Sequence, residues 1–160
     1  MIVVSDTSPL RALAHLGLLP LLGDLYGVVL VPPAVVSELA NSPAELPSIE
    51  ITSLTFIRVQ GPSDPNIVRQ LRRTLDAGES EALALALEVG ADAVLVVERQ
   101  ARAEAVRLGM RPLGVLGFLS RCKSEHRIPA LKPLIERLRK EIGFFVADSL
   151  VERFLNDVGE

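Results

Sequence analysis

The chain has 160 residues, of which 49% are hydrophobic and 4% aromatic, and its formal net charge is −3. A length of this order supports a sizeable core, so we expect residues 1–160 to form a single domain. The net charge excludes a general basic field that attracts nucleic acid, so such binding would need a local patch or metal ions. The one cysteine, Cys122, excludes an internal disulfide and a cysteine zinc site and fits a reducing cytoplasm.

The first predicted element is a short buried strand over Ile2–Val4, because this run is apolar and β-branched. Asp6 follows, and the Thr-Ser-Pro sequence at 7–9 then favours the start of a helix, predicted over 10–16. A carboxylate that ends a buried strand costs free energy unless it is paired, hydrogen-bonded or bound to a metal. Open parallel sheets bind their ligands at the carboxyl ends of their strands, which is where Asp6 lies. Asp6 is therefore a candidate site residue.

The segment 16–36 is apolar enough to raise the question of a membrane span, but Asp24 and several glycines and prolines interrupt it. The N-terminus also enters a strand without the basic-then-apolar pattern of a signal peptide. We therefore expect a soluble, cytoplasmic protein that makes no contact with a membrane.

The rest of the chain alternates strands with helices. Short β-branched runs predict the strands, and apolar segments with helical spacing that end near glycine predict the helices. This alternation predicts an α/β fold in which a parallel sheet lies between helical layers. The predicted strands are 28–31, 55–59 at an edge, 93–97 and 112–115, and the predicted helices are 18–22, 34–40, 66–75, 79–89, 100–108, 116–123, 130–140 and 147–158.

Acidic residues recur at the ends of these elements. Glu38 lies in the helix after the second strand, whereas Glu79 and Glu81 open a later helix. Glu98 follows the strand at 93–97, and we expect it to approach Asp6 because parallel strands end at the same edge of a sheet. Each glutamate also has an ordinary interpretation, as a solvated side chain, as a partner of a neighbouring arginine or as a complement to the helix dipole.

Five segments, in this order and spacing, resemble the PIN-domain superfamily, and in particular its VapC-like prokaryotic branch. The resemblance covers nearly the whole chain. The segments are Val-Ser-Asp-Thr-Ser-Pro-Leu at 4–10, Val-Pro-Pro-Ala-Val-Val-Ser-Glu-Leu at 31–39, Gly-Glu-Ser-Glu-Ala-Leu-Ala-Leu-Ala at 78–86, Gly-Ala-Asp-Ala-Val-Leu-Val at 90–96 and Arg-Pro-Leu-Gly-Val-Leu-Gly at 111–117.

The resemblance implies a three-layer α/β/α fold with a parallel sheet of four to five strands, and a metal-dependent ribonuclease. It places the catalytic and metal-binding acids at Asp6, Glu38 and Glu81, with Glu79 nearby and Ser8 as a polar partner of metal-bound water. Mg²⁺ and Mn²⁺ prefer such oxygen ligands. It also leads us to expect a homodimer, and a toxin whose partner is a small antitoxin protein.

The chain departs from the family pattern after the strand at 93–97. Val97 stands where the resemblance predicts an acid, and Glu98 is the candidate to replace it as a metal ligand. Adjacent side chains at the end of a strand point to opposite sides, however. The departure therefore leaves open an alternative, a catalytically impaired PIN-like module that binds RNA or a protein partner.

Basic residues could hold the substrate. Arg99 and Arg102 are the best candidates for binding RNA phosphates, because they closely follow a strand of the site. The few aromatic residues make base stacking a weak option. His15 and His126 have no acidic or nucleophilic partner suggested by the sequence, so we expect both at the surface.

Two other classes of α/β protein fit less well. A phosphatase of the haloacid dehalogenase type also has an aspartate after its first strand, but it needs Asp-x-Asp, and Ser8 occupies the second position. Rossmann and P-loop nucleotide-binding proteins need glycine-rich phosphate loops, and neither pattern is present.

Overall fold

A computed structural model describes residues 1–160. Its centre is a five-stranded sheet of order β3-β2-β1-β4-β5, in which every neighbouring pair is parallel. This topology confirms the predicted α/β fold with a central parallel sheet, and it places β1 in the middle of the sheet. The strands are β1 (Val3–Ser5), β2 (Val29–Val31), β3 (Ile57–Val59), β4 (Ala93–Leu95) and β5 (Pro112–Leu113).

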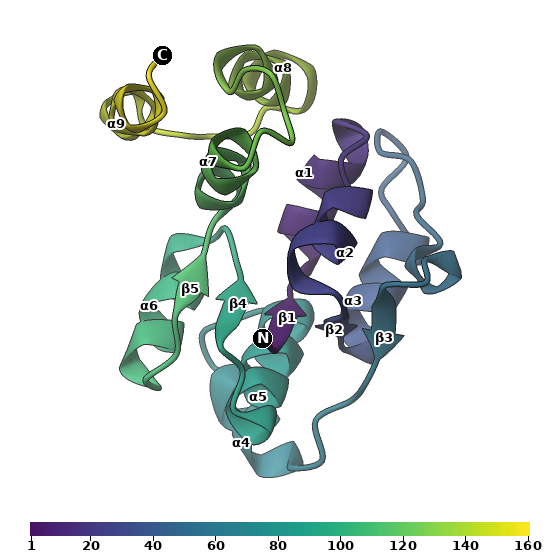
Figure 1. Cartoon of the computed structure of the whole chain (residues 1–160). Helices are drawn as coiled ribbons and strands as arrows, with labels where there is room; N and C mark the ends of the chain where they lie inside the picture. Colours follow the sequence, from purple (N-terminus) through teal and green to yellow (C-terminus); the bar gives the residue numbers. More distant parts are fainter.

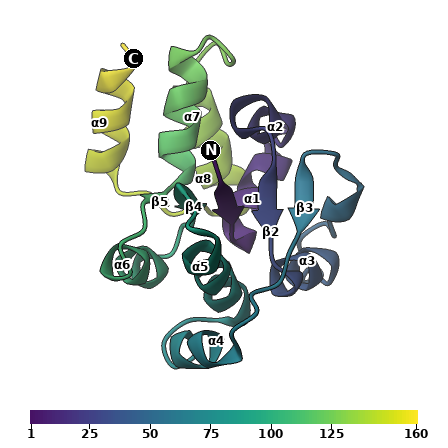
Figure 2. The same ribbon diagram turned by 60° about the horizontal axis from the view of Figure 1, so that its bottom comes forward.

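Helices cover both faces of this sheet (Figure 1). The view in Figure 2 places α4, α5 and α6 below the strands and α7, α8 and α9 above them. None of the helices combines the length and the apolar character needed to cross a bilayer. The helices are α1 (Thr7–His15), α2 (Pro20–Tyr26), α3 (Pro33–Ala40), α4 (Pro65–Leu71), α5 (Ala77–Val89), α6 (Arg99–Arg107), α7 (Val115–Ser124), α8 (Lys132–Ile142) and α9 (Asp148–Asp157), with a short 3-10 helix at Ile51–Ser53.

The core consists of two apolar clusters, one on each face of the sheet. Successive strand residues point to opposite faces, so Val3 and Leu95 join the larger cluster, whereas Val4 and Val94 join the smaller one. Helices α1, α2, α3, α7, α8 and α9 contribute to the larger cluster, and α4, α5 and α6 to the smaller one. Both faces of the central strands are therefore buried, which explains why short and wholly apolar runs predict these strands.

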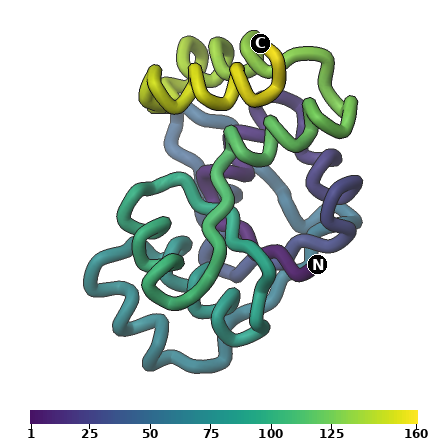
Figure 3. Tube along the Cα trace, turned by 60° about the vertical axis from the view of Figure 1, so that its left-hand side comes forward, coloured from purple at the N-terminus to yellow at the C-terminus, as the bar shows by residue number.

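The C-terminal helices extend the larger cluster beyond the sheet. In Figure 3, α9 (yellow) lies at the top of the molecule with α7 and α8 (green), and the teal α4–α6 region lies below. Val151 of α9 and Ile135 of α8 are buried in the larger cluster. Cys122 is buried in α7.

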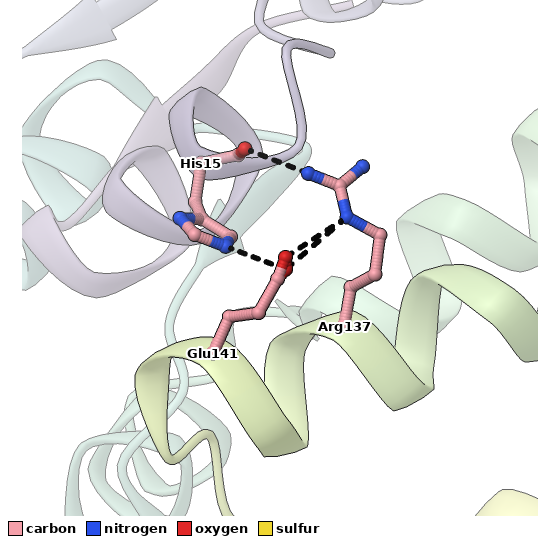
Figure 4. Close-up of polar contacts among 3 residues, drawn as sticks. All are labelled: His15, Arg137 and Glu141. Atoms are coloured by element: carbon pink, nitrogen blue, oxygen red, sulfur yellow. Dashed lines mark hydrogen bonds and ion pairs between the residues drawn. The ribbon is translucent and has the colours of Figure 1, made fainter.

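Polar residues join α8 to the end of α1 (Figure 4). Glu141 Oε2 lies 3.6 Å from His15 Nε2, and Arg137 Nε donates a 3.3 Å hydrogen bond to Glu141 Oε1. Arg137 Nη2 also donates to the carbonyl of His15 at 3.4 Å. The expectation that His15 has no acidic partner is therefore wrong, because packing of α8 against α1 brings together residues that are far apart in the sequence.

Candidate functional site

Asp6 lies at the carboxyl end of the central strand β1. Its backbone is extended and its N–H donates to the carbonyl of Leu95 in β4 at 2.9 Å, so the neighbouring strand holds it in place. Helix α1 starts at the next residue, but the Asp6 side chain makes no capping hydrogen bond to it. The residue as a whole is only 3% exposed. The fold thus holds a buried carboxylate at the strand end without using it to cap the helix.

Glu38 reaches the same place from α3, the helix that follows β2. Its Oε2 accepts a hydrogen bond from the hydroxyl of Thr7, and its Oε1 accepts one from the backbone N–H of Gly78 at 3.0 Å. Arg11 also ties α1 to α3, because its Nη2 donates to the backbone carbonyl of Glu38 at 3.0 Å. Contacts from α1 and α5 therefore fix the position of the Glu38 carboxylate, and Arg11 holds the backbone of α3 beside them.

Asp76 completes the cluster, and sequence analysis did not identify it. It is the N-cap of α5, where its Oδ1 accepts from the N–H of Glu79 at 2.8 Å while Glu79 Oε1 accepts from the N–H of Asp76 at 3.0 Å. A crossover helix that leads into a parallel strand starts at the carboxyl edge of the sheet, which brings Asp76 to Asp6 and Glu38. One oxygen from each of these three residues lies within 4.8 Å of the others.

Gly78 allows the first turn of α5 to approach Glu38 of α3 and Asp6 at the end of β1 closely. A Cβ at this position would lie 2.6 Å from Glu38 Oε2 and 3.0 Å from Asp6 Oδ1. Any larger residue would therefore push the carboxylates aside. The helix predicted from the sequence begins at residue 79, after Gly78, whereas in the structure Gly78 lies within the first turn of α5.

No basic side chain neutralises the cluster. The ion pairs of the structure all involve other carboxylates. Asp6 Oδ1 is buried and has no hydrogen-bond partner. Burial raises the pKa of Asp6 to about 7 against a lowering by the Thr7 backbone N–H, and the charges of Asp76, Glu79 and Glu38 raise it as well. Burial likewise raises the pKa of Glu79, with Asp76 and Glu98 adding to the increase.

The other predicted acids lie around the cluster in different roles. Glu81 Oε1 accepts a 3.1 Å hydrogen bond from the N–H of Ala34, so it supports the start of α3 and is not one of the three clustered carboxylates. Glu79 is buried and completes the capping box of α5. Glu98 is the exposed N-cap residue of α6. Ser8 lies in the first turn of α1, where its neighbour Thr7 makes the contact to Glu38.

Three of the residues that follow β4 line a cavity and are not part of the acidic cluster. Val97 packs against the larger apolar cluster and lines a cavity, together with Arg99 and Arg102 of α6. Arg102 Nη1 donates to the carbonyl of Val96 at 3.3 Å. The valine at the position where an acid was expected therefore contributes to packing beside this cavity.

The chemistry of the cluster suits a divalent cation. Mg²⁺ and Mn²⁺ take carboxylate oxygens as ligands, and clustered carboxylates repel one another unless a cation or protons neutralise them. Asp6, Glu38 and Asp76 supply such oxygens from three different elements, and Asp6 Oδ1 has no competing protein donor. The donor set therefore fits a metal ion of this class.

Comparison with known families agrees with the α/β fold. A family model described as a PIN domain matches residues 2–160 of the chain. No match was found among the curated proteins. The matched segment includes the sheet, the three clustered carboxylates and the cavity beside Val97.

Proposed function

Because the chain belongs to the PIN-domain family, we propose that it is a metal-dependent ribonuclease that hydrolyses phosphodiester bonds of single-stranded RNA with Mg²⁺ or Mn²⁺. The observation that carries the proposal is the buried, unpartnered Oδ1 of Asp6, which lies among carboxylates that no basic residue neutralises. A structural carboxylate at this position would normally be paired, since an unsatisfied buried charge is costly.

Three residues would hold the cation through their carboxylate oxygens, namely Asp6, Glu38 and Asp76. A cation bound there supplies an activated water molecule and neutralises the phosphodiester oxygens. Thr7 and Gly78 orient Glu38 through hydrogen bonds to its two oxygens. Asp6 releases its proton near neutral pH, because burial raises its pKa to about 7.

Further glutamate and arginine side chains have supporting roles in this proposal. The charge of Glu98 raises the pKa of Glu79, and the two carboxylates add to the negative potential that attracts a cation. Glu81 positions α3 through its contact with Ala34. Arg99 and Arg102 would bind RNA phosphates beside the cluster.

The test is cleavage of single-stranded RNA by the purified protein with Mn²⁺, Mg²⁺ or EDTA. We expect cleavage only with a divalent cation, and Asp6→Asn should reduce its rate roughly 100-fold or more because one metal ligand loses its charge. Asp24→Asn is a matched control, since Asp24 is exposed and pairs with Arg127 at 3.8 Å, outside the cluster. Cleavage that is equally fast in EDTA, or in Asp6→Asn, would contradict the proposal.

The second candidate is a module that binds RNA or a protein without cleaving RNA. Val97 is the observation that favours it, because an apolar side chain that packs against the core stands where the family resemblance led us to expect an acid. The two candidates differ in one result. RNA binding that persists with saturating Mn²⁺, without any cleavage product, would support the binding module.

We extend the proposal to the assembly expected of VapC-like proteins, namely a homodimer that a small antitoxin inhibits. The partly buried leucines of the segment 18–22 are a candidate interface, although they also pack against the larger core. Light scattering after size-exclusion chromatography tests the dimer. Growth arrest on expression, relieved by a co-expressed small protein, tests the toxin role.

A further inference from the structure

A cavity lies beyond the carboxyl ends of β4 and β5. It has a volume of about 490 Å³, which is in the range of sites that bind small molecules. Its walls come from the start of α6, from β5 and the start of α7, from the connector between α8 and α9, and from α9 itself. In Figure 1 this connector passes beside α7 on the side of the molecule that holds β5 and α6.

Three arginines line this cavity without an acidic partner. Arg99, Arg102 and Arg153 are absent from all the ion pairs of the structure. Arg99 and Arg153 are exposed, and Arg102 is half-buried. Three unpaired guanidinium groups around one cavity favour an anionic ligand, and phosphate is a preferred partner of arginine.

Aromatic side chains gather at the same cavity. Three of the chain's five phenylalanines line it, namely Phe144, Phe145 and Phe154. Phe145 is 89% exposed, more than any other large apolar side chain of the protein. Arg153 lies with its Cζ 5.7 Å from the ring centroid of Phe154. The low aromatic content suggested that base stacking is a weak option, but the structure concentrates half of the aromatic residues at one place.

The cavity and the acidic cluster are neighbours along the carboxyl edge of the sheet. Val97 lines the cavity, and only Val96 separates it in sequence from Leu95, whose carbonyl accepts a 2.9 Å hydrogen bond from the N–H of Asp6. Glu98 follows Val97 and influences the pKa of Glu79 within the acidic region. A strand of RNA with one phosphodiester at the cluster could therefore place an adjoining nucleotide at the cavity.

We propose that this cavity binds one unpaired nucleotide of the RNA, next to the phosphodiester held at the acidic cluster. The base stacks on Phe145 and contacts the apolar wall of the cavity at Phe144 and Phe154. The arginines bind the flanking phosphates. Any of the four bases can stack on an aromatic side chain, whereas a base paired in a duplex cannot enter the cavity. The proposal rests on the proposed function and adds a reason why the substrate is single-stranded.

The test measures binding separately from cleavage. A fluorescein-labelled single-stranded 2′-O-methyl RNA, which resists hydrolysis, is titrated with the protein in EDTA, and binding is followed by fluorescence anisotropy. Phe145→Ala should weaken binding about tenfold and Phe145→Tyr should restore it, because the affinity for a single strand depends on stacking of its bases on aromatic rings. Both variants should fold, since the side chain is almost fully exposed.

The charge is tested by a matched pair of arginine variants. Arg153→Ala should weaken binding and lower the dependence of log affinity on log salt by about 0.7, as expected for one lost phosphate contact to a single strand. Arg58→Ala removes the same charge from β3, at the opposite edge of the sheet, where Arg58 is exposed and has no ion-pair partner. It should change affinity less than about twofold.

The outcomes separate this proposal from the proposed function. Wild-type affinity in both Phe145→Ala and Arg153→Ala would overturn the nucleotide site, even if cleavage still depends on Asp6. Loss of affinity in these variants would support it, even if the protein cleaves no RNA. If an acidic peptide displaces the RNA while Phe145→Ala binds RNA normally, the cavity belongs to a protein partner and the nucleotide site is rejected.

Discussion

The acidic cluster at the end of β1 and the contact between α8 and α1 differ in whether their carboxylates pair with basic side chains. At the contact, Glu141 pairs with His15 and Arg137, and the hydrogen bond from Arg137 lowers the pKa of the Glu141 carboxyl (Figure 4). At the cluster, burial raises the pKa of Asp6 to about 7, and no basic side chain forms an ion pair with it. Both regions join elements that are distant in sequence.

The difference separates paired charges near the surface from a buried carboxylate that has no ion-pair partner. Paired groups near the surface contribute little to stability and change little when they are removed. A buried carboxylate without an ion-pair partner destabilises the protein in its charged form, and such groups concentrate at functional sites. Removing a charge should therefore change stability clearly at Asp6 and only slightly at the contact between α8 and α1.

The largest expected effect is a pH-dependent loss of stability that depends on Asp6. Its pKa is higher in the folded protein than in the unfolded chain, so proton binding stabilises the fold. This stabilisation is complete below about pH 4 and is lost as the pH rises through about 7. In EDTA, the free energy of unfolding should fall by a few kcal/mol through this group between pH 4 and pH 8.

Urea denaturation of the wild type and of Asp6→Asn at several pH values measures this effect. The variant cannot ionise at this position, so its stability should decline less and should exceed that of the wild type at pH 8. If the free energy of unfolding changed equally with pH in the wild type and in Asp6→Asn, burial would not raise the pKa of Asp6 and the account would be contradicted. Addition of Mn²⁺ at pH 8 should stabilise only the wild type.

A smaller effect is expected from Gly78→Ala. The new Cβ would lie 2.6 Å from Glu38 Oε2, so the carboxylates must move. We expect a loss of about 1–3 kcal/mol in the free energy of unfolding, despite the better helix propensity of alanine, together with loss of Mn²⁺ binding. Thermal denaturation with and without Mn²⁺ measures both.

Gly61→Ala is the control for this substitution, because a Cβ at Gly61 would lie at an ordinary distance of 3.6 Å from Pro33. It should preserve the response to Mn²⁺. If Gly78→Ala responds to Mn²⁺ like the wild type, the close approach of α5 to the carboxylates is not required for the site.

The smallest effect is expected at the contact between α8 and α1. Glu141→Gln removes the charge that His15 and Arg137 share, but the pairs are partly exposed. The melting temperature should stay close to that of the wild type, and Mn²⁺ binding should not change. A large loss of stability in this variant would contradict the distinction between the two regions.

Much of the fold could be predicted from the sequence because local patterns carry it. Wholly apolar β-branched runs fit a sheet that is buried on both faces, and the strand at 55–59 was placed at an edge, where β3 lies. The same reasoning brought attention to Asp6 and Glu38, since each belongs to an element that follows a central strand. The structure brings these two carboxylates together.

Asp76 was missed because the predicted helix began at Glu79, two residues after the observed start of α5 at Ala77. A local signal was available, since Asp76 and Glu79 have the spacing of a capping box. Gly78 and Phe145 offered no such signal. The importance of Gly78 depends on oxygens from β1 and α3, and that of Phe145 on a cavity whose walls come from distant parts of the chain.

The central claim is that Asp6, Glu38 and Asp76 form a divalent-cation site. Isothermal titration of the metal-free protein with Mn²⁺ at pH 8 tests it most directly, with Asp6→Asn, Asp76→Asn and the control Asp24→Asn measured alongside. We predict saturable binding to the wild type and to Asp24→Asn, with much weaker binding to the two cluster variants. Equal Mn²⁺ affinity in all four proteins, or no binding to the wild type, would contradict the claim.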